Sequence, residues 1–136
     1  MGLAERRKIQ SAAEGLSDAQ AELDKELGFQ LPVELQTSSF PEDKDVLYGY
    51  DSYKDYGFPM VCRVLKKVGC DDLGKEALRE KVTRVAIVNT ATDSSNGGEK
   101  SVELADGLLT IKLGWYSYSD KLFGEDEMRE KIEALL

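Results

Sequence analysis

The sequence predicts an α+β domain built on a single, mostly antiparallel four-stranded sheet with helices packed on one face. The first observation is Asp106-Gly107, a two-residue turn signal between alternating apolar stretches, which predicts a β-hairpin over 101–113. The second is the stretch 84–91, which is apolar on both faces, as is typical of a central strand. The third is the element order ααβααβββα, in which helices and strands are segregated rather than alternating.

The chain begins with two predicted helices. Residues 3–14 carry a weak apolar stripe, so 1–15 is expected to be a loosely docked N-terminal arm. A second helix is predicted to begin at Ser17, because Ser17 and Gln20 have the spacing of a capping box, and to end at Gly28. Its buried stripe is predicted to be Ala19, Leu23 and Leu27.

An edge strand is predicted to follow over 29–36. Its apolar side chains alternate with polar residues and a proline, the pattern of a half-buried strand, and they are Phe29, Leu31, Val33 and Leu35. Pro32 has no N–H to donate to a neighbouring strand, so the strand is expected at the edge of the sheet.

Two helices with a sharp corner between them are predicted over 59–82. Pro59 suits the first turn of the first helix, and Gly69 ends it. Asp71 or Asp72 is expected to cap the second helix, because a carboxylate accepts from the free N–H groups there. The buried residues are predicted to be Val61, Val64, Leu65 and Val68 in the first helix, and Leu73, Ala77, Leu78 and Val82 in the second.

The hairpin has a predicted register as well as a predicted turn. Pairing Ala105 with Leu108 places Leu104 opposite Leu109. The apolar face then consists of Val102, Leu104, Leu109, Ile111 and Leu113, whereas Ser101, Glu103, Thr110 and Lys112 share the other face. The chain closes with a predicted helix over 124–136, with Glu125, Asp126 and Glu127 at its start and a stripe of Met128, Ile132 and Leu135.

Composition and charge exclude several classes of function. A length of 136 residues suits one domain, 1–136, and no apolar run is long enough for a membrane helix. The N-terminus lacks the apolar run of a secretory signal, so a cytoplasmic location is expected. The net charge of −8 disfavours nucleic acid and anionic lipid as partners and favours basic ones. The only basic triplet, Arg6-Arg7-Lys8, is flanked by Glu5 and Glu14, as is typical of a solvated helix face.

Catalytic and metal chemistry has little support in the sequence. The chain has no histidine, which removes the commonest general base and metal ligand, and its two cysteines, Cys62 and Cys70, are too few for a zinc site. Tyr50 and Lys54 have a dehydrogenase-like spacing, but no glycine-rich nucleotide turn accompanies them. No cofactor and no metal are therefore expected, and the protein is predicted not to be an enzyme.

A tyrosine-rich, acidic stretch is the candidate site. Its residues are Tyr48, Tyr50, Tyr53 and Tyr56, with Asp43, Asp45, Asp51 and Asp55 between and before them. One interpretation is that the tyrosine rings cover the core. The other is a recognition surface, because tyrosine is enriched at interfaces and acidic charge speeds encounter with a basic partner.

These observations favour a small, non-catalytic protein-binding module whose partner is a protein rather than nucleic acid or a membrane. They are also compatible with a homo-oligomer. One alternative is a small enzyme or ligand-binding domain that uses carboxylates and tyrosines near 42–56. Another is an immunity-type inhibitor of a basic toxin, which the acidic charge alone supports.

Overall fold

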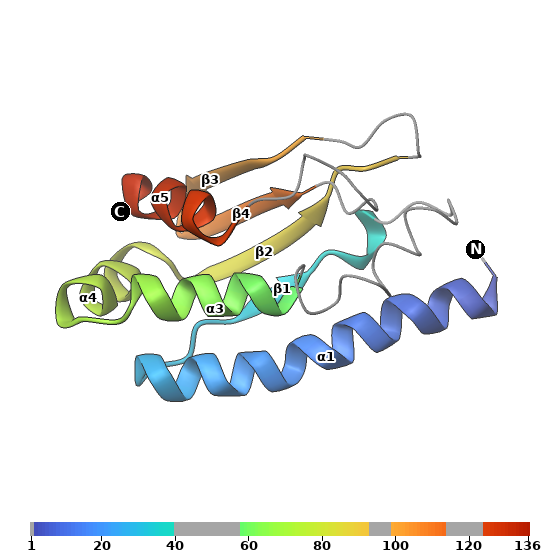
Figure 1. The fold of residues 1–136 in the computed structure, drawn as a ribbon, viewed down its shortest axis with the longest axis horizontal. Coiled ribbons are helices and arrows are strands. Elements are labelled where there is room, and N and C mark those ends of the chain that lie inside the picture. The colour runs from blue at the N-terminus through green and yellow to red at the C-terminus, as the bar shows by residue number, and fades with distance from the viewer. Residues whose placement is uncertain (1, 40–57, 93–98, 114–123) are drawn as a thin grey trace.

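The computed structural model describes residues 2–39, 58–92, 99–113 and 124–136, and within them the fold is α+β (Figure 1). The strands form one sheet in the order β1-β2-β4-β3. They are β1 (Val33–Leu35), β2 (Arg84–Asn89), β3 (Ser101–Ala105) and β4 (Leu108–Leu113). The helices are α1 (Leu3–Leu27), the short 3-10 helix η1 (Thr37–Ser39), α3 (Phe58–Val68), α4 (Asp72–Lys81) and α5 (Glu125–Leu135).

The prediction of a mostly antiparallel sheet is wrong, because the sheet is mixed. β2 pairs in parallel with both β1 and β4, and β3 pairs antiparallel with β4. The reason is the position of the hairpin: β3 forms the outer edge, and the turn brings β4 back beside β2 in the same direction as β2. The apolar character of both faces of β2 is what a strand with two parallel neighbours requires.

The predicted break between two N-terminal helices is also wrong. Residues 3–27 form one continuous helix, α1, in which Ser17 is an exposed interior residue rather than a cap. The side chain of Gln20 contacts β1 instead of the backbone at Ser17. The predicted end at Gly28 is confirmed, since Gly28 takes the left-handed conformation (φ 80°) that ends many helices. Leu23 and Leu27 are buried, as predicted.

β1 lies at the edge of the sheet, as predicted, but Pro32 precedes the strand and its backbone faces β2, so its missing N–H is not on the open side. The strand is shorter than predicted, three residues instead of eight, although side-chain burial alternates as expected from Leu31 to Glu34. The paired length is short because β1 passes directly into η1, where Ser39 N donates back to Gln36 O.

The hairpin is confirmed in turn and register. Asp106 (φ 52°) and Gly107 (φ 80°) both have positive φ, and Leu104 lies opposite Leu109. The C=O of Gly107 accepts from the N–H groups of Thr83 (2.7 Å) and Arg84 (3.3 Å), which fastens the turn to the start of β2. This contact holds β4, rather than β3, beside β2.

The predicted corner between α3 and α4 is confirmed, but the prediction that Leu73 is buried is wrong. Asp71 is the cap, and its side chain accepts from Gly74 N at 2.7 Å. Leu78 and Val82 are buried, but Leu73 is 78% exposed. The buried face runs instead through Gly74 and Leu78, because the backbone of α4 at Gly74 lies against the last carbonyl of α3, that of Val68.

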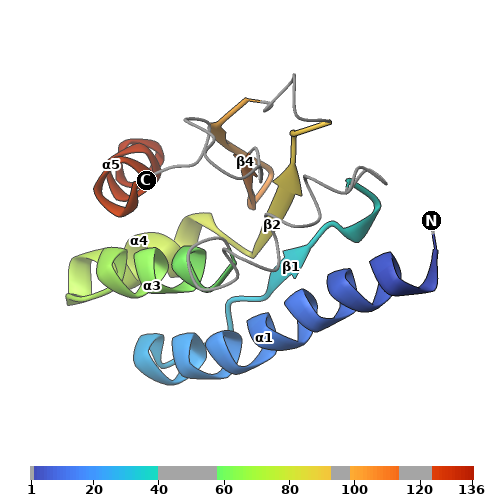
Figure 2. The same ribbon diagram turned by 45° about the vertical axis from the view of Figure 1, so that its right-hand side comes forward.

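The core lies between one face of the sheet and the helices, which Figure 2 shows on the same side of it. Alternate sheet residues enter this core, namely Val33, Val85, Ile87, Leu109, Ile111 and Leu113. In α5 the predicted Met128 and Ile132 are buried, whereas Leu135 is 36% exposed. The described part of the opposite face is more polar and includes an ion pair between Lys112 and Glu103 (3.7 Å). None of the described helices is long and apolar enough to cross a membrane.

Candidate functional site

The predicted recognition residues lie outside the described residues. All eight fall within 40–57: Tyr48, Tyr50, Tyr53, Tyr56, Asp43, Asp45, Asp51 and Asp55. The structure describes the chain on either side of them, where η1 ends at Ser39 and α3 begins at Phe58. Their role in recognition therefore stays a prediction, and the candidate site is built from the described residues that precede them.

The outward edge of β1 is the first component of this site. Pro32 O accepts from Val85 N (2.8 Å) and Gln36 N donates to Ile87 O (2.9 Å), so the residues on either side of β1 face β2. In a parallel ladder, alternate residues direct their N–H and C=O groups to opposite sides. Val33 and Leu35 therefore direct their backbone groups away from β2, towards the open side of the sheet.

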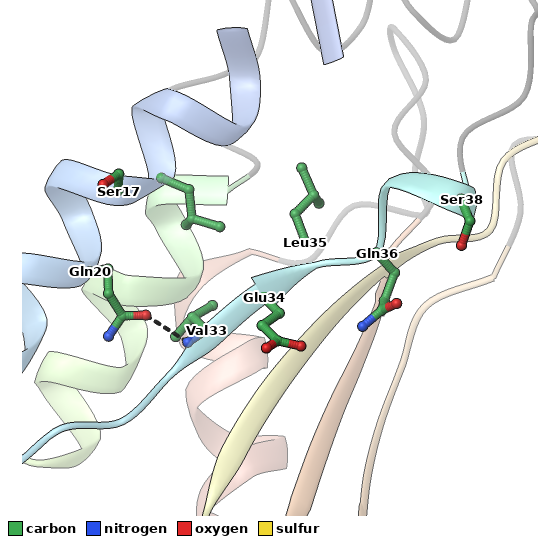
Figure 3. Close-up of a pocket in the computed structure, with 8 residues that line it drawn as sticks. Ser17, Gln20, Val33, Glu34, Leu35, Gln36 and Ser38 are labelled. Atoms are coloured by element: carbon green, nitrogen blue, oxygen red, sulfur yellow. Dashed lines mark hydrogen bonds between the residues drawn. The ribbon is translucent and has the colours of Figure 1, made fainter. Parts of the chain in front are cut away.

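Helix α1 covers the first half of this edge. Gln20 donates to Leu31 O (2.7 Å) and accepts from Val33 N (2.6 Å), the hydrogen bond drawn in Figure 3. Asp24 accepts from Leu31 N (2.9 Å) and from the Gln20 amide (2.8 Å). A primary amide satisfies this edge because it carries both a donor and an acceptor, and Asp24 fixes its orientation.

The described residues leave the second half of the edge open. Within the described part of the chain, no hydrogen-bond partner is present for Val33 C=O or for the N–H and C=O of Leu35. Val33 and Leu35 are among the residues that line a cavity of about 500 Å³ between α1 and β1 (Figure 3). The cavity is lined by Leu16, Ser17, Gln20, Val33, Glu34, Leu35, Gln36 and Ser38, and among these only Glu34 is charged.

Side chains on the two faces of β1 differ in chemistry. Figure 3 shows Leu35 directed to the α1 side of the strand, where Leu16 also lies, and Glu34 and Gln36 directed to the other side. Leu35 is half-buried and Glu34 is exposed. The arrangement combines unpaired backbone groups with an apolar surface on one side and an acidic group on the other.

The sequence interpretation missed this site. It assigned Gln20 to a capping box, whereas Gln20 and Asp24 contact residues 31 and 33. Their spacing of four residues places them side by side on α1. The sequence does show Gln20 and Asp24 as a polar pair next to the buried stripe of the helix. It does not show that this pair hydrogen-bonds to residues 31 and 33.

Asn89 shapes the end of the sheet where the parallel strands β1, β2 and β4 finish (Figure 1). It is buried, with 5% of its surface exposed. Its amide donates to Ser39 O (3.2 Å) and Ala91 O (2.8 Å), and its backbone N–H donates to Ser39 Oγ (3.0 Å). Asn89 therefore fastens η1 to β2 and sets where the chain leaves β1 towards the acidic, tyrosine-rich stretch.

A second cavity, of about 510 Å³, lies between α4 and α5. It is lined by Val68, Asp71, Leu73, Gly74, Ala77, Arg129, Glu133 and Leu136. Arg129 and Glu133 pair across one turn of α5 (2.8 Å), and this partner raises the pKa of Arg129. The exposed Leu73 gives this cavity an apolar wall, but its polar groups are already paired on their own helix.

The thiol of Cys62 is expected to be inert in the folded protein. Cys62 is 1% exposed, and burial raises its pKa to about 11, whereas Cys70 is exposed. Cys62→Ala should lower the free energy of unfolding by about 1 kcal/mol through a small cavity, measured by chemical denaturation. Cys70→Ser is the matched control, with a smaller effect. Rapid alkylation of Cys62 near neutral pH without unfolding would contradict this assignment.

An ion pair between α3 and α5 is expected to make a pH-dependent contribution to stability. Hydrogen bonds from Lys67 (2.7 Å) and Arg63 (2.9 Å) lower the pKa of Glu125. A lowered carboxyl pKa stabilises the fold above the ordinary value of 4.5, and the effect is lost as the pH falls through the folded-state pKa. Because these side chains are partly exposed, Glu125→Gln should cost under about 1 kcal/mol near neutral pH.

The pH series provides the check on Glu125. The difference in unfolding free energy between wild type and Glu125→Gln should shrink as the pH is lowered below 4.5. Glu130→Gln, at an exposed position of the same helix, is the control and should change little at any pH. A difference for Glu125→Gln that persists unchanged in acid would show that the charge is not responsible.

No metal site is formed by the described residues, among which no three His, Cys, Asp or Glu side chains gather closely enough to hold an ion. Comparisons of the chain with protein-family models, curated proteins and solved structures found no match. Function therefore has to be inferred from the chemistry of the chain itself.

Proposed function

We propose that this protein is a non-catalytic binding module whose partner is another protein. The observation that carries the proposal is the open half of β1, where Val33 presents its C=O and Leu35 its N–H and C=O beside a cavity lined by both polar and apolar residues. Unpaired strand edges are surfaces that other chains recognise. Such a surface requires no cofactor, metal or catalytic base.

The acidic, tyrosine-rich stretch supports the same function. Residues 42–55 contain five acidic residues and two lysines, a local charge of −3, within a chain of net charge −8. Acidic charge accelerates encounter with a basic partner, and tyrosine rings supply contact area once the partner is bound. This stretch follows Ser39 along the chain, close in sequence to β1. We propose Tyr48, Tyr50, Tyr53 and Tyr56, with their neighbouring aspartates, as part of the binding surface.

A small-molecule site is the second candidate function. The cavity of about 500 Å³ beside β1 falls in the size range of ligand pockets. Ligand pockets are mostly apolar with a few converging polar groups, whereas Gln20 here is already hydrogen-bonded to the backbone of Leu31 and Val33. The exposed edge therefore favours a protein partner over a small ligand.

Charge and thiol content support two further parts of the proposal. A basic partner fits an acidic chain, and a toxin neutralised by an immunity-type inhibitor would be one such partner. We propose a cytoplasmic location, where Cys62 and Cys70 would stay reduced.

Affinity capture from extracts of the source cells, followed by binding measurements with the purified partner, tests the function. We expect one basic protein to be retained at low salt and released as the salt concentration rises. Tyr50→Ala combined with Tyr53→Ala should weaken binding while circular dichroism and thermal unfolding stay unchanged. Tyr50→Phe with Tyr53→Phe keeps the ring area and is the matched control. Retention that is equal for the wild type and the alanine variant would contradict the role of the tyrosines, and no retained protein would contradict the function.

A further inference from the structure

We infer that the open half of β1 binds an extended segment of the partner as an added strand, and that this segment alternates apolar and basic residues. This inference rests on the proposed protein-binding function and specifies its mode. The place is the α1–β1 groove, defined as the cavity lined by Leu16, Ser17, Gln20, Val33, Glu34, Leu35, Gln36 and Ser38.

The backbone groups determine that the bound segment is extended. Leu35 directs both its N–H and its C=O outward, and Val33 directs its C=O the same way, which is the spacing that a neighbouring strand pairs with. An extended peptide supplies matching donors and acceptors along its length, and main-chain hydrogen bonds then contribute affinity. The described chain provides no partner of its own for these groups.

Helix α1 limits where the added strand begins. Gln20 and Asp24 already bond to Leu31 and to the N–H of Val33, so that part of the edge is closed. The added strand therefore starts beside the C=O of Val33 and continues past Leu35. A short pairing of this kind depends on side-chain contacts for the rest of its affinity.

The two faces of β1 determine the side-chain pattern. Side chains of the added strand that point to the α1 side enter the groove next to Leu16 and Leu35, so apolar residues fit there. Those that point to the other side lie near the exposed Glu34, so lysine or arginine fits there. Opposite charges on adjacent strands stabilise a sheet, and like charges destabilise it.

Charge also distinguishes this occupant from a second copy of the chain. Pairing β1 with its own copy would bring together two chains that each carry a net charge of −8. It would also place the Glu34 side chains of the two copies on the same small surface. Electrostatic repulsion therefore opposes self-pairing and favours a basic segment.

Peptides that bind the full chain are selected from a displayed library of random sequences. The selected peptides are then synthesised, and their affinities for two variants of the protein are measured. Leu35→Pro removes the outward N–H without removing a bond to β2, whereas Leu35→Ala shortens the side chain but keeps the N–H. We expect enriched peptides to alternate apolar and basic residues and to lose about tenfold or more in affinity for Leu35→Pro relative to Leu35→Ala. Thermal unfolding of both variants checks that the fold is retained.

A charge variant keeps the test decisive if Leu35→Pro does not fold. Glu34→Lys should weaken binding of the same peptides by about threefold to tenfold and shift the selection towards acidic sequences. No enrichment of peptides, or equal binding to Leu35→Pro and Leu35→Ala with Glu34→Lys unchanged, would overturn the inference. A wild-type dimer in size-exclusion chromatography that Leu35→Pro dissociates would also overturn it, because a second copy would then occupy the edge.

The outcomes separate the inference from the proposed function. A partner protein that binds Leu35→Pro as tightly as wild type, but loses affinity for the Tyr50→Ala and Tyr53→Ala variant, would retain the function and reject strand addition. Peptides that depend on the Leu35 N–H, together with no protein partner in the capture experiment, would reject the function as proposed.

Discussion

Gly74→Ala is expected to lower the free energy of unfolding by about 3 kcal/mol, although it places a better helix former in α4. A Cβ at this position would lie 1.8 Å from the carbonyl oxygen of Val68 and 3.1 Å from the capping carboxylate of Asp71. The first neighbour is backbone and cannot rotate aside, so α3 and α4 must move apart or the cap must break. Chemical denaturation of the two proteins measures the difference.

The sign of the Gly74 effect distinguishes packing from helix propensity. Propensity alone predicts that alanine stabilises a helix interior by about 1 kcal/mol relative to glycine. Glu80→Ala, at an exposed position of α4, is the control and should change the stability by less than about 0.5 kcal/mol. A Gly74→Ala protein that is more stable than wild type would mean that the close approach of α3 to α4 is wrong.

Gly107→Val is expected to lower the free energy of unfolding by about 2 kcal/mol. Gly107 has φ 80°, a conformation that a β-branched residue resists, and a Cβ there would lie 2.7 Å from Thr83 Oγ1. Moving Thr83 would weaken the hydrogen bonds that it donates to Gly107 O. The loss therefore affects both the turn and its attachment to β2.

Gly107→Asn is the matched control for the turn. Asparagine tolerates positive φ but introduces the same Cβ, so its cost reports the contact with Thr83 alone. We expect Gly107→Val to be less stable than Gly107→Asn in thermal and denaturant unfolding. Equal stability of the two variants would show that backbone conformation does not limit this position.

Local features of the fold could be predicted because neighbouring residues determine them. Asp106-Gly107 specifies a turn with positive φ at both positions, and the alternation around it determines the register. Asp71 caps α4 and Gly28 ends α1 through contacts within a few residues.

The errors involve residues whose contacts lie elsewhere in the chain. Serine often caps a helix, but helix α1 continues through Ser17, and the Gln20 side chain hydrogen-bonds to β1 instead. Leu73 has helical spacing to Ala77, but the close approach of Val68 to Gly74 rotates the buried face of α4 away from it. Periodicity identifies a stripe, whereas the neighbouring helix decides which part of it is buried.

The candidate site could not be predicted for the same reason. The open edge exists because Gln20 and Asp24 bond to residues 31 and 33 and reach no further along β1. Which backbone groups of a strand edge are paired depends on which side chains of the neighbouring helix meet them, and this is set by packing rather than by the residues of the strand.

The sequence by itself determined the α+β class, the hairpin and its register, and the acidic character of the chain. Each of these follows from residue chemistry or from spacings of a few positions. The tertiary structure decided the strand order β1-β2-β4-β3, the parallel pairing of β2 with β1 and β4, and the groove between α1 and β1. These depend on where the Gly107 turn attaches to Thr83 and where Gln20 meets Val33, contacts between residues well separated along the chain.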